Sequence, residues 1–150
     1  MLDRACRSAK AGFAAHARFA QDYDPSLPPT LGDPDQLMQV MLNLLMNAID
    51  AMEGTEESTL RVATTLRRYR VKRPTVEVSF YDSGTGITPE VKDRIFDPFF
   101  TTKSMGTGLG LPLSLQIMKD HGGTIHVRNR PQGGTIFKLQ FPVPEDLEIT

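Results

Sequence analysis

The sequence predicts an α+β domain, a two-layer α/β sandwich in which a mixed, mostly antiparallel sheet has its helices packed on one face. One observation is the apolar stretch "LMQVMLNLLMNAIDAM" (37–52), which has the length of a buried helix. Another is a set of short runs in which apolar residues alternate, as they do in half-buried strands. These helices and strands follow one another without the regular βαβ alternation of a parallel sheet. A chain of 150 residues is long enough to bury a core, and we expect one domain over 1–150.

The overall composition is that of an ordinary globular protein. A net charge of −1 predicts no attraction to nucleic acid and no direct contact with an anionic membrane. The single cysteine, Cys6, excludes an internal disulfide and suits a reducing compartment. No apolar run approaches the roughly 18 residues that span a bilayer, and no signal peptide is visible. We therefore expect a cytoplasmic location, which includes the cytoplasmic portion of a membrane-anchored protein.

The first half of the chain predicts two helices and three strands. Residues 2–14 form a short helix, and "HARFAQDY" (16–23) forms an edge strand. After a Pro-rich connection the long helix begins, with Asp33 as N-cap, Pro34 as its first residue and Gln36 as the capping-box partner. It ends near Met52, before a glycine. Strands follow at 58–66 and 75–82, joined by "RRYRVKRP", which carries five positive charges. This link is either a docking patch for an acidic partner or a solvated hairpin end, and we favour the hairpin end.

The second half of the chain supplies the remaining helices and strands. A short helix is expected at 89–94, an irregular stretch at 96–108, and a helix that ends near His121 before a glycine. Strands at 124–129 and 134–141 close the domain.

The long helix carries a polar stripe. At about 100° per residue, its polar residues fall within an arc of about 80°; they are Gln36, Gln39, Asn43, Asn47 and Asp50. Taken alone, the stripe is best explained as a solvated face. A solvated stripe is, however, more usually made of Lys and Glu, which are good helix formers, and amides suit a surface that must offer fixed carbonyl oxygens.

Two glycine-rich clusters could hold a ligand. In "DSGTGI" (82–87), at a strand end, Asp82 is a hydrogen-bond acceptor suited to an exocyclic amine, and Gly84 and Gly86 let the backbone approach a flat ligand. In "GTGLGL" (106–111), glycines open a helix, where N–H groups and the helix dipole favour phosphate. This second cluster is neither a Walker motif nor a dinucleotide fingerprint.

Further signals lie beside these clusters. Lys103 is placed to reach the same anion, and the stretch from Phe96 to Gly106 is a candidate mobile lid. Phe96, Phe99 and Phe100 either anchor that lid or belong to the core. In "GGTIF" (133–137) the Gly-Gly pair is commonly only a turn, while the Thr135 hydroxyl could face a ligand base.

In this order, the motifs resemble the catalytic ATP-binding domain of bacterial sensor histidine kinases. The wider family, which has the Bergerat ATP-binding fold, includes gyrase, Hsp90-type chaperones and MutL-type repair ATPases. The matching segments are "NLLMNAIDA", "DSGTGI", "IFDPFFTTK", "GTGLGL" and "GGTIF", and "MKDHGGTI" (118–125) is similar as well. They cover residues from about 15 to 142. The short lid that ends in "TTK" resembles the nitrogen-regulation type of sensor kinase.

The resemblance implies a role for each matching residue. Asn47 would be the protein ligand of Mg²⁺, which prefers hard oxygens and takes few protein ligands, and Asn43 would lie near the γ-phosphate of ATP. Asp82 would accept the adenine amino hydrogen. Base-pocket residues would be Gly84, Gly86 and Ile87. Phosphate-binding residues would be Lys103, Gly106, Thr107, Gly108, Leu109 and Gly110.

Asn43 also distinguishes among activities within the family. The ATP hydrolases have a glutamate four residues before the metal-binding asparagine, where it activates water, and an amide cannot act as a general base. Transfer to a protein histidine is therefore favoured over hydrolysis by an ATP-driven clamp. Two further hypotheses are an anti-sigma-type serine kinase and a non-enzymatic nucleotide-binding relay. One departure is Asp50, because many of the kinases have a basic residue there, which weakens the case for a phosphate contact from this position.

A histidine kinase also needs a phosphoacceptor histidine. For His16, His121 and His126 we expect structural roles, because none lies in a phosphoacceptor motif. The expected partner is therefore the phosphoacceptor helical domain of the same or another kinase chain, with a response regulator as indirect partner. Residues 1–14 would be a remnant of a preceding helical linker. We predict that this chain binds ATP and Mg²⁺ but does not phosphorylate itself.

Overall fold

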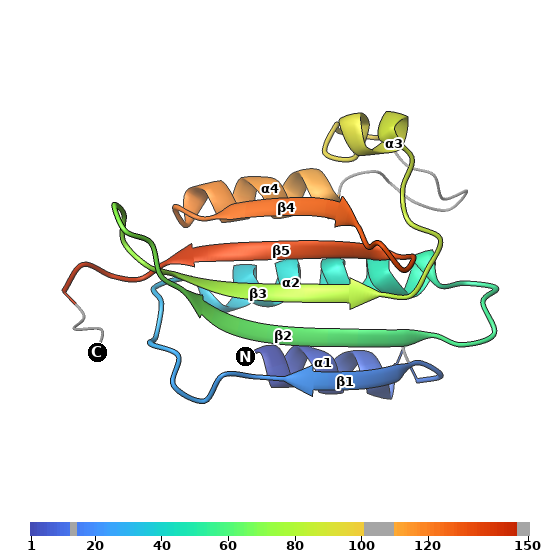
Figure 1. Ribbon diagram of the computed structural model, residues 1–150, viewed down its shortest axis with the longest axis horizontal. Helices are drawn as coiled ribbons and strands as arrows, with labels where there is room; N and C mark the ends of the chain where they lie inside the picture. The colour runs from blue at the N-terminus through green and yellow to red at the C-terminus, as the bar shows by residue number, and fades with distance from the viewer. Residues whose placement is uncertain (13–14, 101–109, 147–150) are drawn as a thin grey trace.

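The computed structural model describes residues 1–12, 15–100 and 110–146, which form two layers (Figure 1). Within these residues the sheet consists of β1 (Arg18–Asp22), β2 (Thr59–Arg67), β3 (Thr75–Asp82), β4 (Thr124–Asn129) and β5 (Thr135–Pro142). The helices are α1 (Leu2–Ala11), α2 (Pro34–Ala51), α3 (Pro89–Arg94) and α4 (Gly110–Asp120). In Figure 1, α1, α2 and α4 lie behind the sheet, and α3 stands apart near one end. The predicted α+β sandwich with helices on one face is confirmed.

The strand order is β1-β2-β3-β5-β4. β1 runs parallel to β2, whereas β2–β3, β3–β5 and β5–β4 are antiparallel pairs. The sheet is therefore mixed and mostly antiparallel, as predicted, with the first strand at an edge. Each strand lies within about two residues of its predicted position, because the alternation of apolar residues marks strand length well.

The core lies between the sheet and α2. Leu60 and Val62 of β2 are fully buried, and Val78 and Phe80 of β3 are nearly so. They pack against the apolar face of α2, whose buried residues are Leu37, Val40, Met41, Leu44, Leu45, Ala48 and Ile49. Because strand side chains alternate between faces, this packing fixes which residues of β3 point toward the helices. Asp82, an even number of residues after Phe80, shares that face.

The start of α2 differs in one respect from the prediction. Asp33 caps the helix, accepting hydrogen bonds from the N–H groups of Asp35 and Gln36 at 2.9 and 3.2 Å. The prediction that Gln36 is the capping-box partner is wrong. The N–H of Asp33 donates instead to Nε2 of His121, at 3.0 Å. His121 stands at the end of α4, where its Nδ1 is 2.7 Å from the Ile117 carbonyl, so its ring joins two helix ends and leaves Gln36 exposed.

α1 is part of the helical layer. Ala5, Cys6 and Ala9 have no exposed surface and belong to the same core as α2. The predicted helix over 2–14 is present as Leu2–Ala11, and residues 13–14 lie outside the described residues. Among the helices that the structure describes, none has the length and apolar character needed to cross a membrane.

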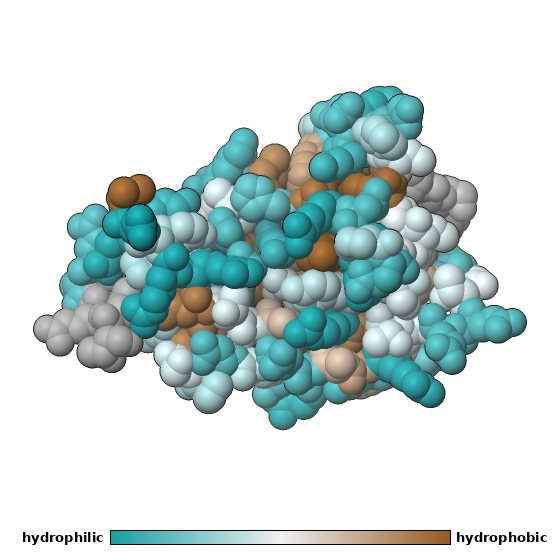
Figure 2. Space-filling view, in the orientation of Figure 1, coloured by the Kyte–Doolittle hydropathy of each residue, from teal (hydrophilic) through white to brown (hydrophobic). Residues whose placement is uncertain are grey.

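Within the described part of the chain, no helix covers the other face of the sheet. Figure 2 shows this face, and hydrophilic residues cover much of it. The link between β2 and β3 projects beyond the sheet at one end (Figure 1), with Val71 96% exposed and the Lys72 ammonium 4.1 Å from the centre of the Tyr69 ring. Such exposure is common to a solvated hairpin end and to a docking patch, so both interpretations of this link stand.

Candidate functional site

Asp82 is a buried carboxylate at the end of β3. Only 2% of the residue is exposed to solvent. Oδ1 accepts two backbone hydrogen bonds, from the N–H of Gly84 at 2.9 Å and from the N–H of Thr135 at 3.1 Å. Both bonds end on the same oxygen, and neither uses Oδ2. The carboxyl is therefore fixed in orientation through one oxygen by the loop that follows β3 and by the start of β5.

Burial dominates the electrostatics of Asp82. It raises the pKa of this carboxyl above its usual value, and the hydrogen bonds from Gly84 and Thr135 and the charge of Arg130 offset only part of the effect. No cation forms an ion pair with Asp82 among the salt bridges of the described residues. A buried carboxylate held by neutral N–H groups is well suited to accept a further hydrogen bond from a ligand.

The glycines around Asp82 stand where other elements come very close. A Cβ on Gly84 would lie 2.3 Å from the carbonyl oxygen of Ala51, at the end of α2. A Cβ on Gly134 would lie 2.0 Å from the carbonyl oxygen of Asp82. Neither position has room for a side chain, so the loop after β3 packs directly on α2 on one side and on the turn before β5 on the other. The predicted cluster at 82–87 thus meets the helix that carries the polar stripe.

The polar stripe of α2 divides into two parts. Gln36 and Gln39 are exposed, so for them a solvated face is the correct interpretation. Asn43, Asn47 and Asp50 are half-buried, and each has at least one polar partner. The C-terminal part of the stripe, which is nearest to Ala51, is therefore the part enclosed by the rest of the domain.

Asn43 contacts the start of α4. Its Nδ2 is 3.3 Å from the carbonyl oxygen of Gly110 and 3.3 Å from Oγ of Ser114. Ser114 is fully buried, and its hydroxyl also donates to the Gly110 carbonyl at 2.9 Å. Ala51 follows Asn43 by about 12 Å at 1.5 Å per residue. The enclosed part of α2 therefore extends from the start of α4 to the loop after Asp82.

The structure describes only some of the predicted site residues. It brings together Asp82, Gly84, Gly86, Ile87 and Thr135 at one end of the sheet, and Asn43 with Gly110 at the start of α4. Lys103, Gly106, Thr107, Gly108 and Leu109 lie outside the described residues, as does most of the proposed lid.

The three phenylalanines near the lid have different surroundings. Phe96 packs against the core, so the core interpretation holds for it. The Phe100 ring lies 4.7 Å from the Arg94 guanidinium, and Phe99 is 73% exposed with a positive φ of 66°.

Three polar residues beside the site were not identified from the sequence. Ser114 lies beneath Asn43, as described above. Asn129 and Arg130, at the end of β4, hydrogen-bond to the backbone of Ile87 and of Asp82. Their neighbourhood, "RNRPQGG", carries only the ordinary signal of a hairpin turn, so the sequence pattern gives no reason to single them out.

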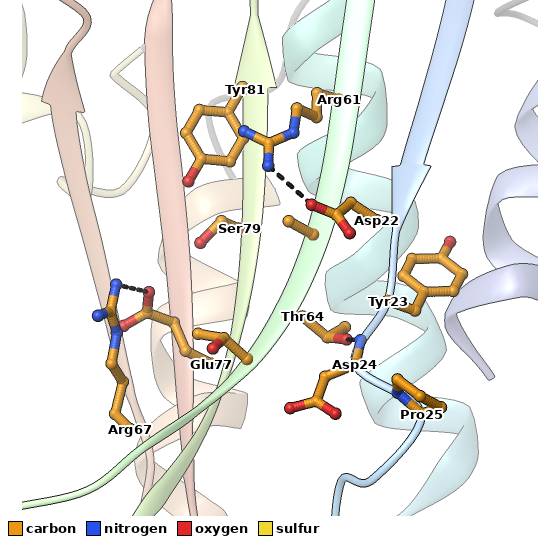
Figure 3. A pocket seen from close by; sticks show the side chains of 12 residues that line it. Asp22, Tyr23, Asp24, Pro25, Arg61, Thr64, Arg67, Glu77, Ser79 and Tyr81 are labelled. Carbon is orange, nitrogen blue, oxygen red and sulfur yellow. Dashed lines mark hydrogen bonds and ion pairs between the residues drawn. The ribbon is translucent and has the colours of Figure 1, made fainter.

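A separate hollow of about 500 Å³ lies on the uncovered face of the sheet, against β1, β2 and β3 (Figure 3). Four of its charged residues form ion pairs, Arg61 with Asp22 at 3.0 Å and Arg67 with Glu77 at 3.3 Å. Asp24, which also lines the hollow, accepts hydrogen bonds from Ser26. It lies across the sheet from the Asp82 side chain, since residues 77, 79 and 81 of β3 point the other way. With most of its charged side chains paired internally, this hollow is a weaker candidate than the surroundings of Asp82.

The comparisons with known proteins agree with each other. A family model described as "Histidine kinase-, DNA gyrase B-, and HSP90-like ATPase" matches residues 32–145. The chain is also similar to the sensory histidine kinase/phosphatase NtrB of Rhodobacter capsulatus, with 45% identity over 98% of this chain. It spans 43% of the length of that relative.

Solved structures give the same result. The catalytic domain of the histidine kinase ThkA superposes with a TM-score of 0.76 at 33% identity, covering 95% of this chain and 92% of that one. A structure of ThkA in complex with the response regulator protein TrrA gives a TM-score of 0.72 at 30% identity, covering 95% of this chain and 40% of that one.

Proposed function

We propose a function on the premise that this chain belongs to the family of histidine kinase-, DNA gyrase B- and HSP90-like ATPases, with sensory histidine kinases among its relatives. We propose that it is the ATP-binding catalytic domain of a sensor histidine kinase, acting in the cytoplasm in two-component signalling. Its reaction transfers the γ-phosphoryl group of ATP to a ring nitrogen of a histidine. The bond between the γ-phosphorus and the bridging oxygen breaks, a P–N bond forms, and ADP leaves.

The observation that carries this proposal is the geometry of Asp82. An adenine amino group offers an N–H donor, and a buried carboxylate with one oxygen already fixed by Gly84 and Thr135 presents the other as acceptor. Gly84, Gly86 and Ile87 would form the wall of the base pocket, and the Thr135 hydroxyl would face the base. A hydrogen bond that exists only for one base provides specificity, because a base without the donor leaves the buried acceptor unpaired.

The phosphates would lie along the enclosed part of α2. Asn43, which contacts the start of α4, would be near the γ-phosphate, and Asn47, one turn further on, would give its amide oxygen to Mg²⁺. One hard oxygen from the protein fits Mg²⁺, which completes its coordination with phosphate and water and, when bound, neutralises phosphate charge. Lys103 would contribute a positive charge close to the phosphates. Backbone N–H groups at Gly106, Thr107, Gly108, Leu109 and Gly110 would hold the phosphates.

Transfer to a histidine is favoured over hydrolysis because position 43 is an amide. Asn43 already donates to Gly110 and Ser114, and it cannot take a proton from water at neutral pH. The acceptor histidine would belong to a helical phosphoacceptor domain of the same or a partner kinase chain, and a response regulator would then receive the phosphoryl group. A response regulator is bound to the histidine kinase ThkA in its complex with TrrA.

The organisation of the chain follows from the same proposal. Residues 1–150 would form one catalytic domain, with 1–14 as part of a helical linker from a preceding phosphoacceptor domain. Two of the described histidines fit structural roles, since His121 joins two helix ends and His126 hydrogen-bonds to Thr124 within β4; His16 is exposed. The chain is then not expected to phosphorylate itself.

Nucleotide titration tests the binding part of this proposal. The chain should bind ATP more tightly with Mg²⁺ than without it. Asn47→Ala should remove most of that difference, since it takes away the amide oxygen proposed to bind the metal. Gln39→Ala, at an exposed position on the same helix, serves as the matched control and should bind as the native chain does. A native chain without measurable affinity for ATP would overturn the proposal.

Radiolabelled γ-phosphate tests the reaction. Label should pass to an added phosphoacceptor helical domain and should be lost on acid treatment, because phosphohistidine is acid-labile. Stable label on the chain alone would contradict a separate acceptor, acid-stable label would indicate a serine kinase, and rapid release of phosphate without an acceptor would indicate an ATPase.

A further inference from the structure

Asn129, the last residue of β4, makes two hydrogen bonds to the backbone of one residue in the loop after β3. Its Oδ1 accepts from the N–H of Ile87 at 2.8 Å, and its Nδ2 donates to the carbonyl of Ile87 at 2.7 Å. The two residues are 42 positions apart in the sequence. One side-chain amide therefore satisfies both backbone groups of Ile87, as a neighbouring strand would.

Only a carboxamide can form this pair of bonds. A neutral amide offers an acceptor and a donor side by side, whereas an ionised carboxylate offers two acceptors and would repel the Ile87 carbonyl. A serine hydroxyl has a single oxygen and could not reach both groups. The chemistry of position 129 is thus matched to the backbone it holds.

The neighbouring residues fit around this contact. Gly86 has a positive φ of 78°, and a Cβ there would lie 2.9 Å from Oδ1 of Asn129. Arg130 donates from Nη1 to the carbonyl of Asp82 at 2.8 Å. Consecutive residues at the end of β4 therefore fix both ends of the loop from Asp82 to Ile87.

We propose that Asn129 is a positioning residue for the base of the nucleotide. This inference rests on the proposed function, since Asp82, Gly86 and Ile87 would form the base pocket. Asn129 holds the far end of that loop in the conformation that a purine requires, while Oδ1 of Asp82 is fixed at the near end. A loop ordered before binding loses less conformational entropy when the ligand arrives, so the contact increases affinity without touching the nucleotide.

The test compares ATP with inorganic triphosphate, which has the phosphates but no base. The native chain should prefer ATP, because only ATP places a base against Asp82 and Ile87. Asn129→Ala should raise the Kd for ATP about tenfold, as expected for the loss of two hydrogen bonds. It should raise the Kd for inorganic triphosphate much less, so that the preference for ATP falls. Asn129→Asp should show the same change, with an affinity no higher than that of Asn129→Ala.

Gln132→Ala, an exposed position in the same hairpin, is the matched control and should leave both affinities unchanged. Amide hydrogen exchange gives a second readout, because the Ile87 N–H should exchange faster in Asn129→Ala. Native affinity for ATP in Asn129→Ala would overturn this inference and leave the proposed function intact. An equal loss for ATP and inorganic triphosphate, or a variant that no longer folds, would overturn it too, because Asn129 would then support the whole domain. Failure of the native chain to bind ATP would instead refute the proposed function.

Discussion

The two faces of β3 each carry one buried carboxylate, and their surroundings are opposite in character. Asp82 lies on the face that the helices cover and Glu77 on the face that they leave open, yet their residues are only 2% and 3% exposed. Neutral N–H groups hold Asp82, and its pKa is raised, chiefly by burial. Burial alone would also raise the pKa of Glu77, but hydrogen bonds from Gln140 and Arg67 and the charges of Lys138 and Arg67 bring it below its ordinary value.

Glu77 uses both of its oxygens within the protein. Oε1 lies 3.3 Å from Arg67 and 3.5 Å from Lys138, and Oε2 accepts from Gln140 at 3.1 Å (Figure 3 shows the pair with Arg67). The carboxylate is thus neutralised by its neighbours. Asp82, by contrast, keeps its charge without an ion pair in the described residues and commits one oxygen to N–H donors. Burial alone therefore does not identify a candidate binding group, and the partners of each carboxylate oxygen are the better guide.

The largest expected effect comes from filling the space beside Asp82. Gly134→Ala would place a Cβ 2.0 Å from the Asp82 carbonyl oxygen at a φ of +93°, so the strand end or the turn must move. We expect a loss of about 3 kcal/mol or more in the free energy of unfolding. ATP affinity should fall as well, because Thr135 would no longer hold Oδ1. Urea unfolding and nucleotide titration measure the two effects.

Gly133→Ala is the matched control for that substitution. Gly133 has a φ of +101°, but a Cβ there would meet nothing within 4 Å. Gly133→Ala should therefore lower the free energy of unfolding only by the cost of backbone strain, about 1–2 kcal/mol, and should retain the native affinity for ATP. Similar losses for the two variants would show that conformation, and not the close approach to Asp82, limits this turn.

Removing the charge of Asp82 should separate binding from stability. Asp82→Asn keeps an oxygen for Gly84 and Thr135 but presents an N–H group to the adenine amine, so we expect a loss of ATP affinity of about 100-fold. Burial of the ionised carboxylate opposes folding at neutral pH, and the free energy of unfolding should rise by about 1 kcal/mol. Calorimetric titration and thermal unfolding provide the two values. A variant that loses affinity and stability together would indicate that Asp82 is structural.

Glu77→Gln should have the opposite outcome. It removes the charge that neutralises Arg67 and Lys138 while keeping the hydrogen-bonding shape, and we expect a loss of about 1–2 kcal/mol in the free energy of unfolding. ATP affinity should stay at the native level, because the side chain lies across the sheet from Asp82. A drop in affinity without a drop in stability would contradict the assignment of Glu77 as a structural group.

The contrast between the two carboxylates also shows which features of the structure could be predicted from the sequence and which could not. The sheet, α2 and the loop after β3 follow from local patterns: alternation in β3, a cap at Asp33, and glycines next to Asp82. Each of these depends on residues close together in the chain, and each was predicted.

The contacts that were missed join distant segments. Glu77 occupies a polar position in the alternation of β3, and its burial depends on Lys138 and Gln140, more than 60 residues away. Asn129 reaches Ile87 over a gap of 42 residues, and His121 replaced Gln36 as the acceptor for the Asp33 N–H. In each case the local sequence allows several possible partners for a polar group, and tertiary packing selects one of them. The segment that contains Lys103 stays a prediction.

The smallest expected effect, and the sharpest form of the comparison, is the pH dependence of stability. Because the folded pKa of Glu77 is lowered, its stabilising contribution is present above its ordinary value of 4.5 and is lost as pH falls through the folded pKa. Because the folded pKa of Asp82 is raised, its contribution is present below its ordinary value of 3.8 and is lost as pH rises through the folded pKa. Unfolding free energies of the native chain, Asp82→Asn and Glu77→Gln should therefore be measured from acidic to neutral pH.

As pH falls, the stability advantage of the native chain over Glu77→Gln should shrink, and its deficit relative to Asp82→Asn should shrink as well. As pH falls, the deficit relative to Asp82→Asn should begin to shrink at a higher pH than the advantage over Glu77→Gln does, because the pKa of Asp82 is raised while that of Glu77 is lowered. Nucleotide affinity adds a control, since it should fall as Asp82 becomes protonated and should not respond to Glu77. If both stability differences changed over the same pH range, the two carboxylates would have similar pKa values in the folded chain, and the contrast between the two faces of β3 would be lost.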